Sequence, residues 1–80
     1  MGNYEDLIGE AVRMLHEHDG RREVVERKLR ERLKQDREFQ YALVGEELPA
    51  DDGRRARRLH EKAIENVYDL VEAALRRLNR

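Results

Sequence analysis

Apolar residues recur at three- and four-residue spacing in three segments of the chain, the spacing that places side chains on one face of a helix. The first segment covers residues 3–18. Its stripe consists of Tyr4, Leu7, Ile8, Ala11, Val12 and Leu15. Asn3 is a favourable N-cap residue, and Asp19-Gly20 is typical of a helix end. We therefore expect a first helix over residues 3–18.

The second segment, residues 21–44, carries an apolar stripe that polar residues interrupt. The stripe begins with Val25 and Leu29, but at about 100° per residue Asp36 and Gln40 fall on the same face. Two interpretations are open. Either the helix breaks near Asp36, which then caps a short further helix, or one helix continues and points polar groups into a pocket or a partner. We favour a single helix that bends near Asp36.

The third segment, residues 53–79, follows a connector at 45–52 and has the widest apolar stripe. The stripe covers about half of the helix circumference, which is more than one neighbouring helix needs. It therefore indicates contact with two neighbours, or with one neighbour and a second copy of the chain. We expect a homodimer whose interface is formed by Ile64, Tyr68, Val71, Leu75 and Leu78.

These helices predict an all-α fold: a three-helix bundle with up-down-up topology, in a single domain covering residues 1–80. No apolar run approaches the about 20 residues of a membrane-spanning helix, so we expect neither a membrane span nor a secretory signal. The chain contains no cysteine, which excludes disulfides and thiolate metal sites. A cytoplasmic location fits these features.

Charge is distributed in blocks, although the net charge is only −1. Residues 1–20 and 38–52 are strongly acidic, whereas residues 21–37 and 53–62 are strongly basic. Such blocks pair with one another inside a fold or face outward as patches that bind charged partners. The two basic blocks are therefore candidate binding surfaces.

The second basic block opens the third predicted helix with four arginines: Arg54, Arg55, Arg57 and Arg58. Positive side chains in the first turns oppose the helix dipole, so a sequence selected for stability alone would place acids there. One interpretation is an anion-binding patch for a nucleic-acid backbone or an acidic protein surface. The other, which we favour, is pairing with the preceding acids, Glu46, Glu47, Asp51 and Asp52.

The first basic block lies in the second predicted helix, where acids alternate with the cations. Glu23 stands four residues before Arg27, a spacing that allows an ion pair on a helix surface. Glu26 precedes Arg30 by the same distance. A solvated face with internal salt bridges is therefore favoured over a helix that reads a nucleic-acid groove. The cations that remain candidates for phosphate contacts are Arg27, Lys28, Arg30, Arg32, Lys34 and Arg37.

The large apolar side chains of residues 39–44 point in several directions. Phe39 and Tyr41 cannot both face the core, because successive helical residues turn by about 100°. Either the connector covers the side chains left outside, or they form an exposed aromatic patch at an interface. We therefore group Phe39 and Tyr41 with the four arginines as candidate partner-binding residues.

Few residues offer the chemistry that an enzyme or a metal site needs. The chain contains no serine, threonine or cysteine to act as a nucleophile, and its glycines form no phosphate-binding loop. His16 and His18 point to opposite sides of a helix, and no Glu-x-x-His or His-x-x-x-His motif occurs. We therefore expect no enzymatic activity, metal, cofactor or small-molecule substrate.

In size and charge the chain is similar to the small helical regulators and inhibitors of phage and bacteria, such as anti-CRISPR proteins and antitoxins, although no motif carries this likeness. It implies a non-enzymatic regulatory module that binds a partner protein through charged and apolar helix faces. One alternative is a nucleic-acid-binding protein that uses the arginines of residues 54–58 and the cations of the second helix. The other is a structural oligomer or a designed helical bundle.

Overall fold

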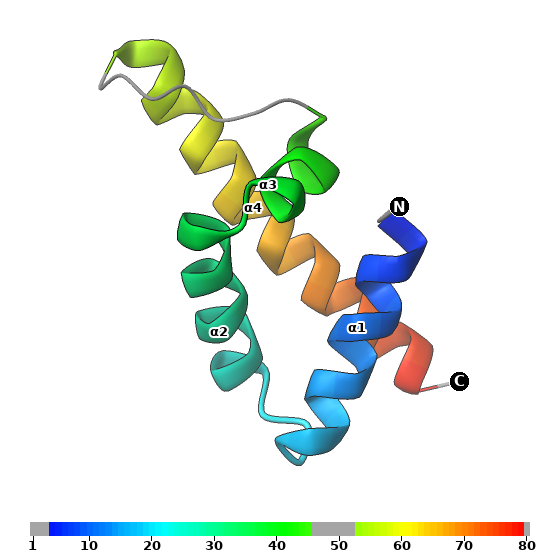
Figure 1. Ribbon diagram of the computed structural model, residues 1–80. Helices are drawn as coiled ribbons and strands as arrows, with labels where there is room; N and C mark the ends of the chain where they lie inside the picture. Colours follow the sequence, from blue (N-terminus) through cyan, green and yellow to red (C-terminus); the bar gives the residue numbers. More distant parts are fainter. Residues whose placement is uncertain (1–3, 46–52, 80) are drawn as a thin grey trace.

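Four helices make up the part of the chain that the structure, a computed structural model, describes: residues 4–45 and 53–79. They are α1 (Tyr4–Glu17), α2 (Arg22–Gln35), α3 (Arg37–Val44) and α4 (Arg54–Leu78), and these described residues contain no strand (Figure 1). The predicted all-α class is thus confirmed. The three-helix up-down-up bundle is not, because the second predicted helix is divided into α2 and α3. None of these four helices is long and apolar enough to cross a membrane.

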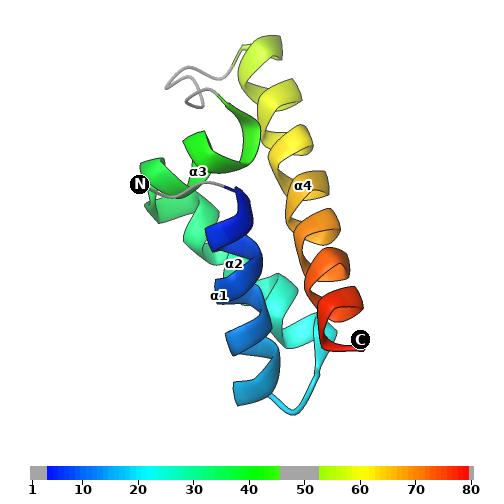
Figure 2. The ribbon, with the colours of Figure 1, turned by 90° about the vertical axis from the view of Figure 1, so that its right-hand side faces the viewer.

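One layer of the fold is α4 alone, and the other three helices lie on one side of it (Figure 2). Its 25 residues run along most of the molecule, whose longest dimension is 40 Å. Apolar side chains from all four helices meet between the layers and exclude water there. The buried core consists of Leu7, Ile8, Ala11, Leu15, Val25, Leu29, Leu33, Phe39, Leu43, Ala63, Val67, Leu70, Val71 and Ala74.

The breadth of the apolar stripe on α4 is explained by its neighbours within the chain, since α4 contacts α1, α2 and α3. Val71, which we expected at an interface between copies, is 0% exposed in the single chain and cannot contact a second copy. Ile64, Leu75 and Leu78 are half-buried and pack against the same core. The stripe therefore gives no independent support for self-association.

The division between α2 and α3 falls at Asp36, whose backbone is extended, with φ −119° and ψ 103°. The Asp36 carboxylate accepts a hydrogen bond from the Phe39 amide at 3.1 Å, as an N-cap side chain does. The Asp36 amide donates to the Arg32 carbonyl at 2.9 Å and so completes the last turn of α2. Our preference for one continuous helix is therefore wrong, and the alternative of a break capped by Asp36 is correct.

Gln40 stabilises the other side of this break. The last four carbonyls of a helix have no partner within it, and the carbonyl of Leu33 is one of these in α2. The buried Gln40 side chain donates a hydrogen bond from Nε2 to that carbonyl. At the end of α3, Asn66 of α4 donates from Nδ2 to the Leu43 carbonyl at 2.8 Å. The polar residues that interrupt the apolar stripe thus serve as helix caps.

We expect Asp36→Ala to lower the melting temperature by about 4–8 °C at neutral pH, the effect of losing one N-cap in a domain of this length. The hydrogen bond from the Phe39 amide, followed by that from Arg32, holds the pKa of Asp36 below its ordinary value of 3.8. A carboxylate with a lowered pKa stabilises the fold above its ordinary pKa, and the contribution disappears as the pH falls through the lowered value. The difference between wild type and variant should therefore shrink below about pH 4, as thermal unfolding at a series of pH values would show.

Asp36→Asn is the matched control, because asparagine also caps helices but carries no charge. This variant should keep most of the stability at neutral pH and lose the pH dependence that belongs to residue 36. A wild type–alanine difference that stays constant down to the lowest pH would contradict the assigned role of the carboxylate.

Candidate functional site

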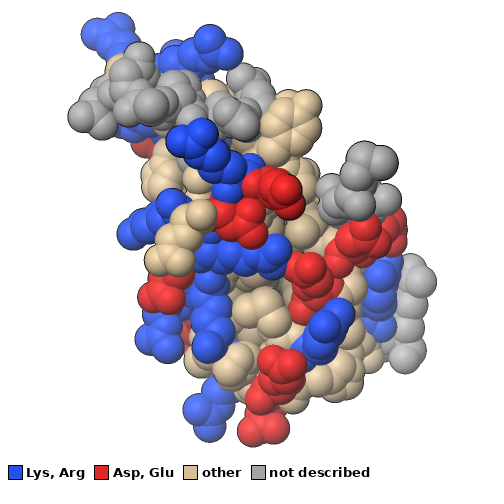
Figure 3. Space-filling model, in the orientation of Figure 1, with Lys and Arg blue, Asp and Glu red and all other residues tan. Residues whose placement is uncertain are grey.

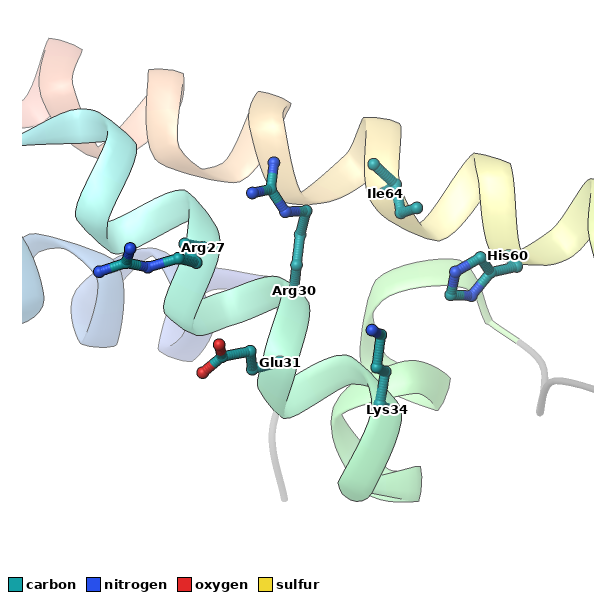
Figure 4. A pocket seen from close by; sticks show the side chains of 6 residues that line it. All are labelled: Arg27, Arg30, Glu31, Lys34, His60 and Ile64. Carbon is teal, nitrogen blue, oxygen red and sulfur yellow. The ribbon is translucent and has the colours of Figure 1, made fainter.

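A groove of about 320 Å³ lies between α2 and α4 (Figure 4). Its α2 residues are spaced three and four apart, and its α4 residues are one turn apart, so each helix contributes one face. The residues that line the groove are Arg27, Arg30, Glu31, Lys34, His60 and Ile64. The site is therefore basic, with one acid at its edge and one apolar side chain in its wall.

The side chains of the groove fall into two sets by direction. Arg30 and Lys34 extend from α2 towards α4, His60 extends from α4 towards α2, and Ile64 lies against the α4 ribbon (Figure 4). Arg27 and Glu31 extend sideways from α2 and do not reach across to α4, although both line the groove. Arg30, Lys34 and His60 consequently extend into the space between the helices, while Glu31 lies at its edge.

Arg30 enters the groove without a carboxylate partner among the described residues. Its Nη1 donates to the hydroxyl of Tyr68 on α4, and its guanidinium carbon lies 5.7 Å from the centroid of the Tyr68 ring. The predicted pair with Glu26 does not form, because Glu26 pairs with Arg22 Nε at 2.8 Å. Arg30 is half-buried and held by a neutral group, so its charge and its other N–H donors stay available.

Arg32, on the same helix, shows the opposite situation. Its Nη1 lies 2.6 Å from Glu10 Oε2 of α1, and its Nε lies 3.2 Å from Asp36 Oδ2. Its guanidinium carbon lies 4.6 Å from the centroid of the Phe39 ring. The hydrogen bond to Glu10 is the largest of the effects that raise the pKa of Arg32. Arg32 therefore joins α1 to the α2–α3 break, and two carboxylates already pair with its charge.

No ion pair joins Arg27, Lys34 or His60 to another described residue. The described ion pairs lie elsewhere, for example between Glu5 and Arg77 at 2.8 Å. On the face seen in Figure 3, Lys and Arg gather along the side of α2, whereas Asp and Glu lie mainly over α1 and α3. The groove thus belongs to the basic side of the molecule.

The four arginines of residues 54–58 are exposed in the first turns of α4. The N-cap residue, Gly53, has no side chain with which to cap the helix, and the first turn holds no acidic residue. The favoured pairing with acids of the connector lies outside the described residues. None of the four arginines lines the groove, but Arg57 precedes His60 by three residues and so lies on the same side of α4.

The two aromatic candidates separate in the structure. Phe39 is only 2% exposed, because the break at Asp36 turns α3 so that this ring enters the core; its assignment to a partner surface is wrong. Tyr41 is 58% exposed and remains available to a partner. Tyr68, expected at an interface between copies, is half-buried against Arg30 of its own chain.

Sequence reasoning identified the cations of α2 but missed the contact between Arg30 and Tyr68. These residues are 38 positions apart, and no spacing rule relates them. The only signal was that Tyr68 lies near the edge of the apolar stripe, where a polar tip can reach a neighbouring helix.

The described residues also limit what kind of site this can be. Within residues 4–45 and 53–79, no group of three His, Asp or Glu side chains is arranged to hold a metal ion. The side chains around the groove can bind an anion by charge and hydrogen bonds. No protein-family model, curated protein or solved structure matches the chain, so this chemistry rests on the groove itself.

Proposed function

We propose that the protein is a non-enzymatic regulatory module that binds an acidic segment of a partner protein in the groove between α2 and α4. The observation that carries the proposal is the set of cations around this groove, none of which forms an ion pair with a described carboxylate. An acidic partner would neutralise them, and complementary charges accelerate and select association. By covering an acidic surface of another protein, the chain would regulate that protein without catalysing a reaction.

The mixed character of the groove favours a protein over a nucleic acid as the partner. Glu31 at the edge would repel a continuous phosphate backbone, whereas a protein can place a cation opposite it. Ile64 offers apolar contact area that a polypeptide side chain can cover. An acidic segment with an apolar residue therefore fits the groove.

Nucleic acid is the second candidate, and a separate observation supports it. Arg54, Arg57 and Arg58 are exposed at the start of α4, in line with the electropositive end of that helix. Binding of this kind would weaken steeply with salt, because each phosphate contact releases a counterion.

The test measures fluorescence anisotropy with two labelled probes, a peptide rich in glutamate and leucine and a random-sequence DNA duplex. We expect the peptide to bind the wild type, and the double variant Arg27→Glu, Lys34→Glu to bind it at least about tenfold more weakly. The double variant Arg13→Glu, Lys28→Glu changes the net charge equally at exposed positions outside the groove, so its affinity should stay close to wild type.

Two outcomes would contradict the proposal. Equal weakening in both double variants would mean that only the net charge matters, not the groove. Binding to the duplex with a steep loss between about 50 and about 200 mM salt, and no binding of the peptide, would favour the nucleic-acid alternative.

A further inference from the structure

We infer that the groove holds one phosphoryl group of the partner, bound by Arg30 and Lys34 of α2 and His60 of α4. The inference rests on the proposed function and names the chemical group that the groove recognises. Its basis is that these three donors line one groove, with the apolar side chain of Ile64 between Arg30 and His60 along α4 (Figure 4).

Arg30 is the anchor because its position is already fixed. The Tyr68 hydroxyl accepts one of its N–H groups, and the Tyr68 ring lies beside the guanidinium at 5.7 Å. A guanidinium held in this way loses little side-chain entropy when an anion binds. Its charge is unpaired among the described residues although the side chain is half-buried, so an incoming anion gains a favourable interaction that no internal carboxylate already satisfies.

Lys34 and His60 complete the site from two further directions. The Lys34 ammonium is a mobile positive charge with three donors, and a histidine ring offers an N–H donor in either charge state. Lys34 lies between Arg30 and His60 along the groove (Figure 4). The anion is therefore approached from both helices, and Glu31, the described carboxylate that lines the groove, does not extend across it to α4 (Figure 4).

This arrangement fits a phosphate monoester better than a carboxylate. A phosphoserine carries a charge of about −1.5 to −2 at neutral pH and three acceptor oxygens, which matches three donors from different directions. A carboxylate has two oxygens in one plane and is satisfied by a single arginine. The groove of about 320 Å³ leaves room for the phosphoryl group and for the chain that carries it. A phosphorylated segment of a partner protein is therefore the predicted occupant.

The experiment compares three forms of one short labelled peptide, with phosphoserine, serine or glutamate at the same central position, by fluorescence anisotropy. We expect the phosphoserine form to bind the wild type at least about tenfold more tightly than the glutamate form. Unlabelled inorganic phosphate should displace the phosphoserine peptide, and amide shifts in a two-dimensional NMR titration with phosphate should centre on Arg30, Lys34 and His60.

Three variants separate the roles within the site. Arg30→Gln should weaken binding of the phosphoserine peptide by about tenfold or more. Lys28→Gln removes the same charge from an exposed position outside the groove, so its effect should be several times smaller. Tyr68→Phe keeps all charges and should weaken phosphoserine binding a few-fold while the melting temperature and the affinity for the glutamate peptide stay close to wild type.

Each remaining outcome would overturn the inference. If the glutamate and phosphoserine forms bind equally and both depend on Arg27 and Lys34, the proposed function stands and the phosphoryl site does not exist. If Lys28→Gln and Arg30→Gln have equal effects, the contribution is general charge. If the random duplex binds more tightly than the phosphoserine peptide, the groove recognises a nucleic-acid backbone. If no peptide and no phosphate binds, both the site and the proposed function are wrong.

Discussion

Replacing Phe39 with alanine should lower the free energy of unfolding by about 3–5 kcal/mol, the loss found when a buried phenylalanine is truncated. The ring is 2% exposed and lies beneath the Arg32 guanidinium, whose carbon is 4.6 Å from the ring centroid. Truncation would therefore leave a cavity and remove the surface on which Arg32 rests. Since a domain of 80 residues has a total stability of about 4–12 kcal/mol, the variant should be close to unfolding. Urea denaturation followed by circular dichroism would measure the change.

Tyr41→Ala is the control for this result. Tyr41 belongs to the same helix, two positions further on, but is 58% exposed, so its truncation should change stability by no more than about 0.5 kcal/mol. Similar stability losses in the two variants would show that α3 does not pack as described. Because Tyr41 remains at the surface, the same variant can be used to test whether the exposed ring contributes to partner binding.

Gln40→Met should also destabilise the fold, by about 1–3 kcal/mol, although methionine is apolar and has nearly the same length. The buried Gln40 amide donates to the Leu33 carbonyl, one of the carbonyls that the end of α2 leaves without a helical partner. Methionine cannot donate this hydrogen bond. Leaving a buried carbonyl without a partner lowers the free energy of unfolding by about 1–3 kcal/mol. The helical pattern alone predicts that this substitution stabilises the fold, because an apolar residue at position 40 would complete the apolar stripe.

Gln35→Met is the matched control, since Gln35 is exposed at the end of α2. Its change in stability should stay within about 0.5 kcal/mol. A Gln40→Met variant that is as stable as wild type in urea would show that water or another group satisfies the Leu33 carbonyl, and the capping role of Gln40 would then be incorrect.

The sequence predicted the fold as far as local rules reach. Helical spacing identified α1 and α4 to within a residue or two of Tyr4–Glu17 and Arg54–Leu78. Residues 21–44 were predicted as helical, and a break capped by Asp36 was one of two interpretations, but helical spacing alone gave no reason to prefer it over a single bent helix. The hydrogen bond that decides between these interpretations joins Asp36 to Phe39, and it exists only once the backbone has turned.

The candidate site was predicted less completely, because it depends on contacts between distant helices. The cations of α2 were visible in the sequence, but their partners were not: Glu26 accepts from Arg22 and leaves Arg30 to Tyr68. Interface residues were also assigned from the width of a stripe, without knowing how many helices would cover it. Val71 illustrates this, since α4 contacts three other helices in the same chain.

The position of α4 in the chain determines when the protein can fold during synthesis. Every other helix packs against α4, and the carbonyl of Leu43 receives its hydrogen bond from Asn66. While the ribosome is still translating the first half of the sequence, the apolar faces of α1, α2 and α3 have no layer to close against. We therefore expect the nascent chain to stay open, and accessible to chaperones and proteases, until residues 54–78 have emerged.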